Sequence, residues 1–163
     1  MTDWTEPAIP GETPIDRIGL RIASITTRRE LNAYEAEGIR KVALKYFATK
    51  PNQRLASFEM GWLLKLHREM FGSVWDWAGK IRSKELNLGY PIGAIAEGLA
   101  SLIGDLHSWS GYGVPLIEQS ARLHHRAVKI HPFNNGNGRW SRMLANIWLR
   151  RNDEQPIMWP EDM

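Results

Sequence analysis

The sequence contains no cysteine. This absence excludes a disulfide-stapled fold, a thiolate zinc site and a cysteine nucleophile. No stretch approaches the roughly 18 consecutive apolar residues that a membrane-spanning helix needs. The first residues also lack the basic and then apolar pattern of a secretion signal. We therefore expect no membrane partner and take the cytoplasm as the default location.

The chain also has no cluster of basic residues. It carries 21 Lys and Arg against 18 Asp and Glu, for a net charge of +3. The basic residues stand singly or in pairs, whereas a protein that binds a polyanion usually presents a basic stripe. This distribution argues against a nucleic-acid partner. The basic isoelectric point keeps nucleic-acid binding only as a third hypothesis.

The length and composition indicate one folded domain. A chain of 163 residues with 43% hydrophobic residues can bury a single substantial core. Residues 1–25 contain Pro7, Pro10, Gly11 and Pro14 and show no sustained periodicity, so we interpret them as an irregular N-terminal arm. Residues 26–163 are then expected to form a single domain.

Apolar spacing of three and four residues predicts five helices. The first runs from about 28 to 48, and Thr27 and Glu30 form its capping box. The others are expected over Leu55–Met70, Ile92–Leu106, Leu116–Ile130 and from about Asn137 to Trp148. Residues 82–90 are compatible with a short hairpin or an extended loop. The predicted fold class is all-α with one small non-helical flap near residues 82–90.

Residues 131–142 carry the chemistry. Pro132 disfavours helical geometry at His131, so the fourth helix should end there. Gly136, Asn137 and Gly138 tolerate positive φ, and backbone N–H groups at such a turn can converge on an anion. The N-terminus of a following helix adds its free N–H groups and its dipole. The sequence therefore predicts a phosphate site.

Two arginines and a histidine extend this site. Arg139 and Arg142 are three residues apart and share one face of the first helical turn. Two guanidinium groups beside a phosphate nest suit a di- or triphosphate. The imidazole of His131 has the pKa range of a general base for an attacking hydroxyl. Together these groups indicate phosphoryl-type transfer.

The same segment closely resembles the motif of the Fic-domain family, His-x-Phe-x-Asp/Glu-Gly-Asn-Gly-Arg-x-x-Arg. The residues that match it in place are His131, Phe133, Gly136, Asn137, Gly138, Arg139 and Arg142. Residues 66–79 are similar to the family's segment before its flap, and the likeness covers about residues 25–150. The resemblance implies a Fic-like helical bundle with a small β-hairpin flap.

The resemblance also implies the activity, which is transfer of AMP from ATP to a Tyr, Thr or Ser hydroxyl of a target protein. His131 would deprotonate that hydroxyl, and Asn135 together with residues 136–139 and Arg142 would bind the nucleotide phosphates. The flap would align a target segment by strand-like pairing through Lys84, Leu86, Leu88 and Tyr90. A bacterial toxin–antitoxin pair, with an antitoxin as partner, is the biological context that the resemblance suggests.

One position departs from the family pattern. The family's acidic residue, which holds Mg²⁺, is Asn135 here. A carboxamide offers a dipole and one neutral oxygen in place of a charge, although Mg²⁺ needs few protein ligands when phosphates and waters supply the rest. The asparagine and its flanking sequence resemble a branch of the family called mobile mystery protein B. The alternative function is therefore a weakened or inactive nucleotide-binding module that acts through protein interaction.

The family's regulatory helix carries the pattern Ser/Thr-x-x-x-Glu-Gly/Asn. The nearest match is residues 33–38, which have Glu37 and Gly38 but alanine at the hydroxyl position. The resemblance suggests Glu37 as an inhibitory residue, and a solvated helix face is the alternative. If Glu37 is inhibitory, Glu37→Gly should raise auto-modification.

Three further features have structural alternatives. His124 and His125 could contribute to a metal cluster, but adjacent helical residues point about 100° apart, which favours packing. Trp75 and Trp77 could stack on bases, but their spacing beside an apolar helix favours the core. Trp148 and Trp159 lie near the end of the sequence, and their partial exposure would favour a homo-oligomer or another partner.

Overall fold

The computed structural model describes residues 16–160 and contains five α-helices within them. They are α1 (Arg28–Phe47), α2 (Met60–Phe71), α3 (Ile95–Trp109), α4 (Leu116–Ile130) and α5 (Asn137–Arg151), with a 3-10 turn, η1 (Ile92–Ala94), before α3. The described residues form no strand, and Leu20 and Trp75 make an isolated bridge. The all-α prediction is confirmed.

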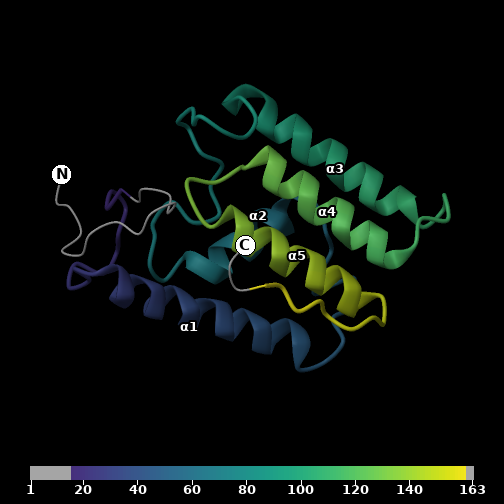
Figure 1. Cartoon of the computed structure of the whole chain (residues 1–163), viewed down its shortest axis with the longest axis horizontal. Helices are drawn as coiled ribbons and strands as arrows, with labels where there is room; N and C mark the ends of the chain where they lie inside the picture. Colours follow the sequence, from purple (N-terminus) through teal and green to yellow (C-terminus); the bar gives the residue numbers. More distant parts are fainter. Residues whose placement is uncertain (1–15, 161–163) are drawn as a thin grey trace.

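Helix α2 lies at the centre of the bundle. It contacts α1, α3 and α5, while α4 packs between α3 and α5 (Figure 1). The indole N–H of Trp140 donates to the carbonyl of Leu63 at 3.0 Å and fastens α5 to α2. The loop that joins α4 to α5 contains the predicted phosphate site, so these contacts hold both of its ends.

The helix boundaries follow local signals. The Thr27 hydroxyl accepts the Glu30 N–H at 3.1 Å and the Glu30 carboxylate accepts the Thr27 N–H at 3.3 Å, which confirms the capping box. The second helix starts later than predicted. Asn52 caps a turn by accepting the Leu55 N–H, and Phe58 has a φ of +56°, which no helix tolerates.

The predicted β-hairpin flap is wrong, because residues 82–90 form an irregular loop, called the flap below. The backbones of its two ends do not pair with each other. The Arg82 N–H donates to the Pro132 carbonyl and the Tyr90 N–H donates to the Ile130 carbonyl. The end of α4 and the residues after it therefore take the hydrogen bonds that a hairpin would have used.

The expectation for Trp148 is also wrong. Its side chain is buried at 5% exposure, and its N–H donates to the Gln119 side chain at 3.0 Å. Trp159 is partly buried and packs on the His124 ring with centroids 4.5 Å apart. The burial of Trp148 therefore removes one reason to expect a homo-oligomer, which stays a prediction.

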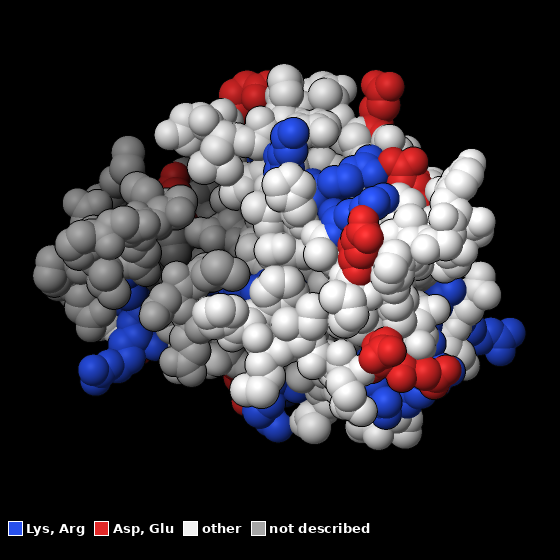
Figure 2. All heavy atoms as spheres, turned by 45° about the vertical axis from the view of Figure 1, so that its right-hand side comes forward, with Lys and Arg blue, Asp and Glu red and all other residues white. Residues whose placement is uncertain are grey.

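Residues 16–25 contain no helix or strand, and residues 1–15 lie outside the described residues, so the N-terminal arm stays a prediction. Across residues 16–160, no helix is long and apolar enough to cross a membrane. On the face drawn in Figure 2, basic and acidic side chains stand beside one another and no basic stripe crosses it. That face gives no support to nucleic-acid binding.

Replacing the α1 cap should test how far this helix depends on its first turn. Thr27→Ala removes the acceptor for the Glu30 N–H, so we expect a loss of about 1 kcal/mol in the free energy of unfolding. Urea denaturation measures it, and Thr27→Ser, which keeps the hydroxyl, serves as the control. Equal stability of the alanine and serine variants would contradict the role of the cap.

Candidate functional site

His131 terminates α4 in the left-handed conformation, with φ +54° and ψ +62°. The helix thus ends at the residue predicted from Pro132. Burial, and secondly the positive charge of Arg82, lower the pKa of His131 below its usual value. The imidazole is therefore neutral near pH 7, and a neutral imidazole can accept a proton.

The turn that starts α5 requires glycine. Gly136 caps the helix at φ +79°, and a Cβ there would lie 2.7 Å from the Phe71 ring. The side chain of Asn137 has a role that the sequence did not indicate. It accepts the Phe133 N–H at 3.0 Å and donates to the Phe133 carbonyl at 2.9 Å. Its side chain therefore braces the loop, while its backbone stays at the helix N-terminus.

A cavity of about 460 Å³ opens over this turn. Its lining comes from α4, the loop and the first turn of α5, namely His124, Val128, His131, Asn134, Asn135, Gly136, Asn137, Gly138, Arg139 and Arg142. All the phosphate-binding residues predicted from the sequence are thus brought together beside His131. Burial, and then the charge of Arg139, lower the pKa of Arg142. The crowded cations and the helix N-terminus make this cavity suited to an anion.

The predicted inhibitory residue does not lie at this cavity. Glu37 is exposed on α1 and pairs with Arg40 at 2.7 Å. The carboxylate that reaches the site is Glu35, which is 3% exposed and lies 2.9 Å from the Arg139 guanidinium. Two positions along a helix rotate a side chain by about 200°, so Glu35 and Glu37 face opposite sides.

Burial raises the pKa of Glu35, and the positive charge of Arg139 opposes that rise. The guanidinium also lies 4.7 Å over the Phe71 ring. Arg139 is therefore held from behind by a carboxylate and an aromatic face. The resemblance pointed to Glu37, whereas the glutamate of α1 that contacts the motif is Glu35.

The residues of the cavity do not fit a protein-bound Mg²⁺. No carboxylate is among the described residues that line it, and the Asn135 side-chain oxygen accepts the Gly136 N–H at 2.6 Å. Mg²⁺ favours oxygen ligands with negative charge. Across residues 16–160 there is also no group of three His, Cys, Asp or Glu side chains that could hold a metal, so the alternative of a His124–His125 cluster finds no support.

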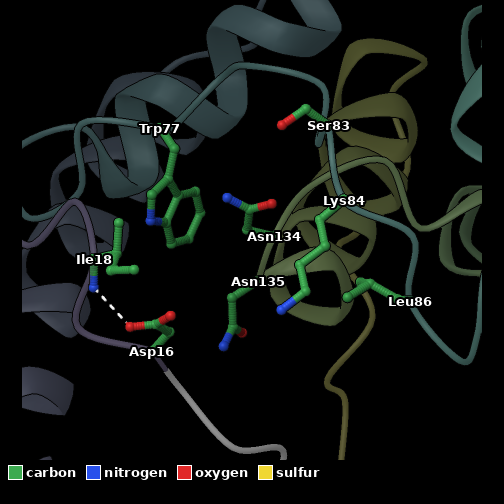
Figure 3. A pocket seen from close by; sticks show the side chains of 8 residues that line it. All are labelled: Asp16, Ile18, Trp77, Ser83, Lys84, Leu86, Asn134 and Asn135. Carbon is green, nitrogen blue, oxygen red and sulfur yellow. Dashed lines mark hydrogen bonds between the residues drawn. The ribbon is translucent and has the colours of Figure 1, made fainter. Parts of the chain in front are cut away.

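A second cavity of about 350 Å³ adjoins the first on the flap side. Figure 3 shows Lys84 and Leu86 on one side of it and Trp77 and Ile18 on another, with Asn134 and Asn135 between them. These two asparagines line both cavities. The motif loop is thus the wall between an anion cavity and a cavity bounded by the flap.

The four residues expected to dock a target do not all face this second cavity. Lys84 and Leu86 line it, and Leu88 is 49% exposed. The Tyr90 ring instead packs over Gly98 of α3, where a Cβ would come within 2.8 Å of it. Of the two tryptophans, Trp75 is buried in the core, as its spacing indicated, and stacks on Trp77 at 5.0 Å.

Sequence reasoning missed the role of His67. This histidine of α2 is fully buried and stacks on Phe133 with centroids 3.7 Å apart. Its Nδ1 accepts the Gly79 N–H at 2.9 Å, so Nε2 carries the proton and donates to the Asn135 carbonyl at 2.9 Å. His67 therefore holds the motif loop against the segment that leads into the flap. Its position in the stretch 66–79, itself similar to the family, was the available signal.

The pKa of His67 is lowered to about 3, chiefly by burial, which the bond to the Asn135 carbonyl opposes and the positive charge of Arg139 reinforces. A depressed pKa means that the folded state binds this proton less readily than the unfolded chain does. Neutral, buried His67 therefore makes its full contribution to the free energy of unfolding above about pH 6.5. This contribution is lost as the pH falls toward 3.

We expect His67→Gln, which keeps a donor and an acceptor but does not titrate, to flatten the dependence of the unfolding free energy on pH between 6.5 and 3. Urea denaturation at a series of pH values measures the slope of the unfolding free energy against pH for the wild-type protein and for His67→Gln. Identical slopes for the two proteins would contradict a neutral, buried His67.

The chain is similar to proteins of one family. The profile of the Fic/DOC family matches residues 57–149. The protein adenylyltransferase fic-1 of Caenorhabditis briggsae is 33% identical over 103 residues, which are 60% of this chain and 20% of that protein. The protein adenylyltransferase Fic of Drosophila willistoni is 32% identical over 125 residues, which are 74% of this chain and 25% of its own length.

Solved structures agree with the sequence comparison. Fic-1 from Caenorhabditis elegans superposes with a TM-score of 0.69 at 26% identity, covering 86% of this chain and 42% of that one. The chain thus spans only a fifth to a quarter of these curated relatives. Because the family profile covers more than half of the sequence, and its motif forms the walls of the anion cavity, this chain belongs to the Fic/DOC family.

Proposed function

We propose that this chain transfers AMP from ATP to a Tyr, Thr or Ser hydroxyl of a target protein. The observation that carries the proposal is the cavity in which His131, the glycine turn and both arginines meet, next to a second cavity bounded by the flap. The names of the curated relatives, which are protein adenylyltransferases, support it. The first cavity suits the nucleotide and the second suits the target.

In this reaction His131 acts as the general base. Its neutral imidazole accepts the proton of the target hydroxyl, and the oxygen attacks the α-phosphorus. The new bond joins that oxygen to phosphorus, and the bond to the pyrophosphate oxygen breaks. Pyrophosphate leaves with the electron pair. The lowered pKa of His131 keeps the base available near pH 7.

The phosphates would rest on the backbone N–H groups of residues 136–138, with Arg139 and Arg142 beside them. Charge-assisted hydrogen bonds from two guanidinium groups stabilise the negative charge that gathers on the leaving pyrophosphate. Mg²⁺ held by the nucleotide's own phosphates and water is compatible with this site.

Incubation with α-³²P-labelled ATP and Mg²⁺ tests the proposal. We expect wild-type protein to label itself or a protein of a bacterial lysate, and His131→Ala to lose this label by a factor of at least about 100. His125→Ala is the matched control, because His125 is an exposed histidine on the same helix and outside both cavities.

Asn135→Asp separates transfer from mere binding. The aspartate adds a negatively charged oxygen beside the phosphate cavity, so we expect it to lower the Mg²⁺ concentration needed for half-maximal labelling. If Asn135→Asp produces label and the wild-type protein does not, the alternative function is favoured, which is a nucleotide-binding module that acts through protein interaction. Label that persists in His131→Ala would overturn the assignment of the base.

Glu35 should restrain nucleotide binding, because its carboxylate occupies a guanidinium that the phosphates also need. We expect Glu35→Gln to tighten binding of a fluorescent ATP analogue several-fold and to raise self-labelling. Glu37→Gly is the matched control on the same helix, and we expect it to change neither, since Glu37 pairs with Arg40. Weaker nucleotide binding in Glu35→Gln would show that the ion pair instead holds Arg139 ready for the phosphates.

The toxin–antitoxin context, an antitoxin, a homo-oligomer and the cytoplasm stay predictions. The contact between Glu35 and Arg139 bears on the antitoxin, since a restraining carboxylate already comes from α1 of the chain itself. An antitoxin, where present, would need to act at another surface or to strengthen this contact.

A further inference from the structure

Arg82 has no catalytic role in the scheme above, yet its guanidinium lies at the junction of the flap and the motif loop. The side chain is fully buried, with an exposure of 0%. Its Nε donates to the His131 carbonyl at 2.7 Å, its Nη1 to the Lys84 carbonyl at 2.9 Å and its Nη2 to the Tyr90 carbonyl at 2.5 Å. One fork of donors therefore joins both ends of the flap to the residue that would act as base.

The backbone repeats this connection. The Arg82 N–H donates to the Pro132 carbonyl, and the Tyr90 N–H donates to the Ile130 carbonyl. Gly89 has a φ of +86° and lies so close to the histidine that a Cβ would come 2.6 Å from the His131 Cβ. The flap thus packs directly on His131, and each side of that residue is tied to it.

His131 needs such support. A left-handed conformation at a residue other than glycine is strained and persists only where the surroundings enforce it. Here the enforcing contacts are the Arg82 bond to its carbonyl and the backbone bonds on both sides. A histidine that must meet a hydroxyl in one orientation benefits from this restraint, because small misplacements cost large factors in rate.

We propose that Arg82 is a positioning residue, which fixes His131 relative to the flap so that a target segment seated there presents its hydroxyl to the base. The inference rests on the proposed function and adds a second residue to its machinery. The buried guanidinium of Arg82 donates to three carbonyls that lie in three directions. The single ammonium group of a lysine cannot reproduce this arrangement.

The charge of Arg82 gives the proposal a measurable signature. His131 shares its cavity with His124 of α4 and with Arg139 and Arg142 of α5, and Lys84 lines the adjoining cavity. Arg82 donates to the His131 carbonyl, and the Glu85 carboxylate of the flap lies 3.9 Å from the Arg82 guanidinium. Removing the Arg82 charge removes one repulsion against protonated His131, so the pKa of His131 should rise. Because the base works in its neutral form, the acidic limb of the rate profile should move to higher pH.

Three variants separate charge from position. Arg82→Met removes both, and Arg82→Lys keeps the charge and loses the fork. Gly89→Ala also keeps the charge, but its Cβ would lie 2.6 Å from the His131 Cβ and 2.9 Å from the Arg82 Nη2, so it displaces the flap from both. We expect each to lower the labelling rate at saturating ATP by at least about tenfold. The ATP concentration for half-maximal rate should change less than twofold, because the phosphate-binding turn is not touched. Only Arg82→Met should shift the pH profile.

Arg122→Met and Arg122→Lys are the matched controls, because Arg122 is a half-exposed arginine of α4 that pairs with Glu118 away from both cavities. Circular dichroism and thermal unfolding show which variants keep the fold. Should Arg82→Met unfold, Arg82→Lys and Gly89→Ala still test the positional part of the proposal.

A readout without catalysis distinguishes failure of this inference from failure of the proposed function. Nuclear magnetic resonance of nucleotide-free protein gives the titration of the His131 ring and, from its Cα and Cβ shifts, its left-handed backbone. We expect the ring to titrate at higher pH in Arg82→Met, and the backbone shifts to move in all three variants.

If the wild-type protein transfers no label, the proposed function is overturned. The nuclear magnetic resonance data then still decide whether Arg82 positions His131. Folded Arg82→Lys and Gly89→Ala with wild-type rates and unchanged His131 shifts would overturn the role of Arg82.

Discussion

Two left-handed residues, His131 and Gly136, bring the end of α4 and the start of α5 to one place. Between them the chain reverses in a few residues, so the imidazole and the free N–H groups of α5 open onto the same cavity. Glycine adopts this conformation freely, whereas histidine does so only under constraint. The constraint comes from the flap and from α2, through Arg82 and His67, and the rest of the site depends on it.

The electrostatics of the cavity follow from what is packed behind it. Arg139 and Arg142 enter the first turn of a helix whose N-terminus already favours negative charge, and their mutual repulsion is offset on one side by Glu35. With Asn135 in place of an acid, no carboxylate stands among the described residues that line the cavity. The cavity thus attracts an anion, while its partly buried imidazole remains neutral.

Much of the fold could be predicted from local patterns. Apolar spacing located the helices, and Thr27 with Glu30, Pro132 within the motif and Gly136 marked three of their ends. The second helix starts late because Asn52 closes a turn with Leu55 and Phe58 has a positive φ, neither of which apolar periodicity reports. The flap failed as a hairpin because its ends found better partners in residues 130–132.

By itself the sequence determined which groups gather at the site, since His131, the glycine turn and the two arginines lie within twelve consecutive residues and their spacing fixes their mutual placement. Only the tertiary structure decided what surrounds them. It selected Glu35 instead of Glu37, it committed the Asn137 side chain to the loop, and it placed His67 and Arg82 against the motif from more than 45 residues away in the sequence. The reason is physical: hydrogen bonds within a turn depend on neighbouring residues, whereas a buried ion pair or a bridging histidine depends on helices whose packing angles no local pattern contains.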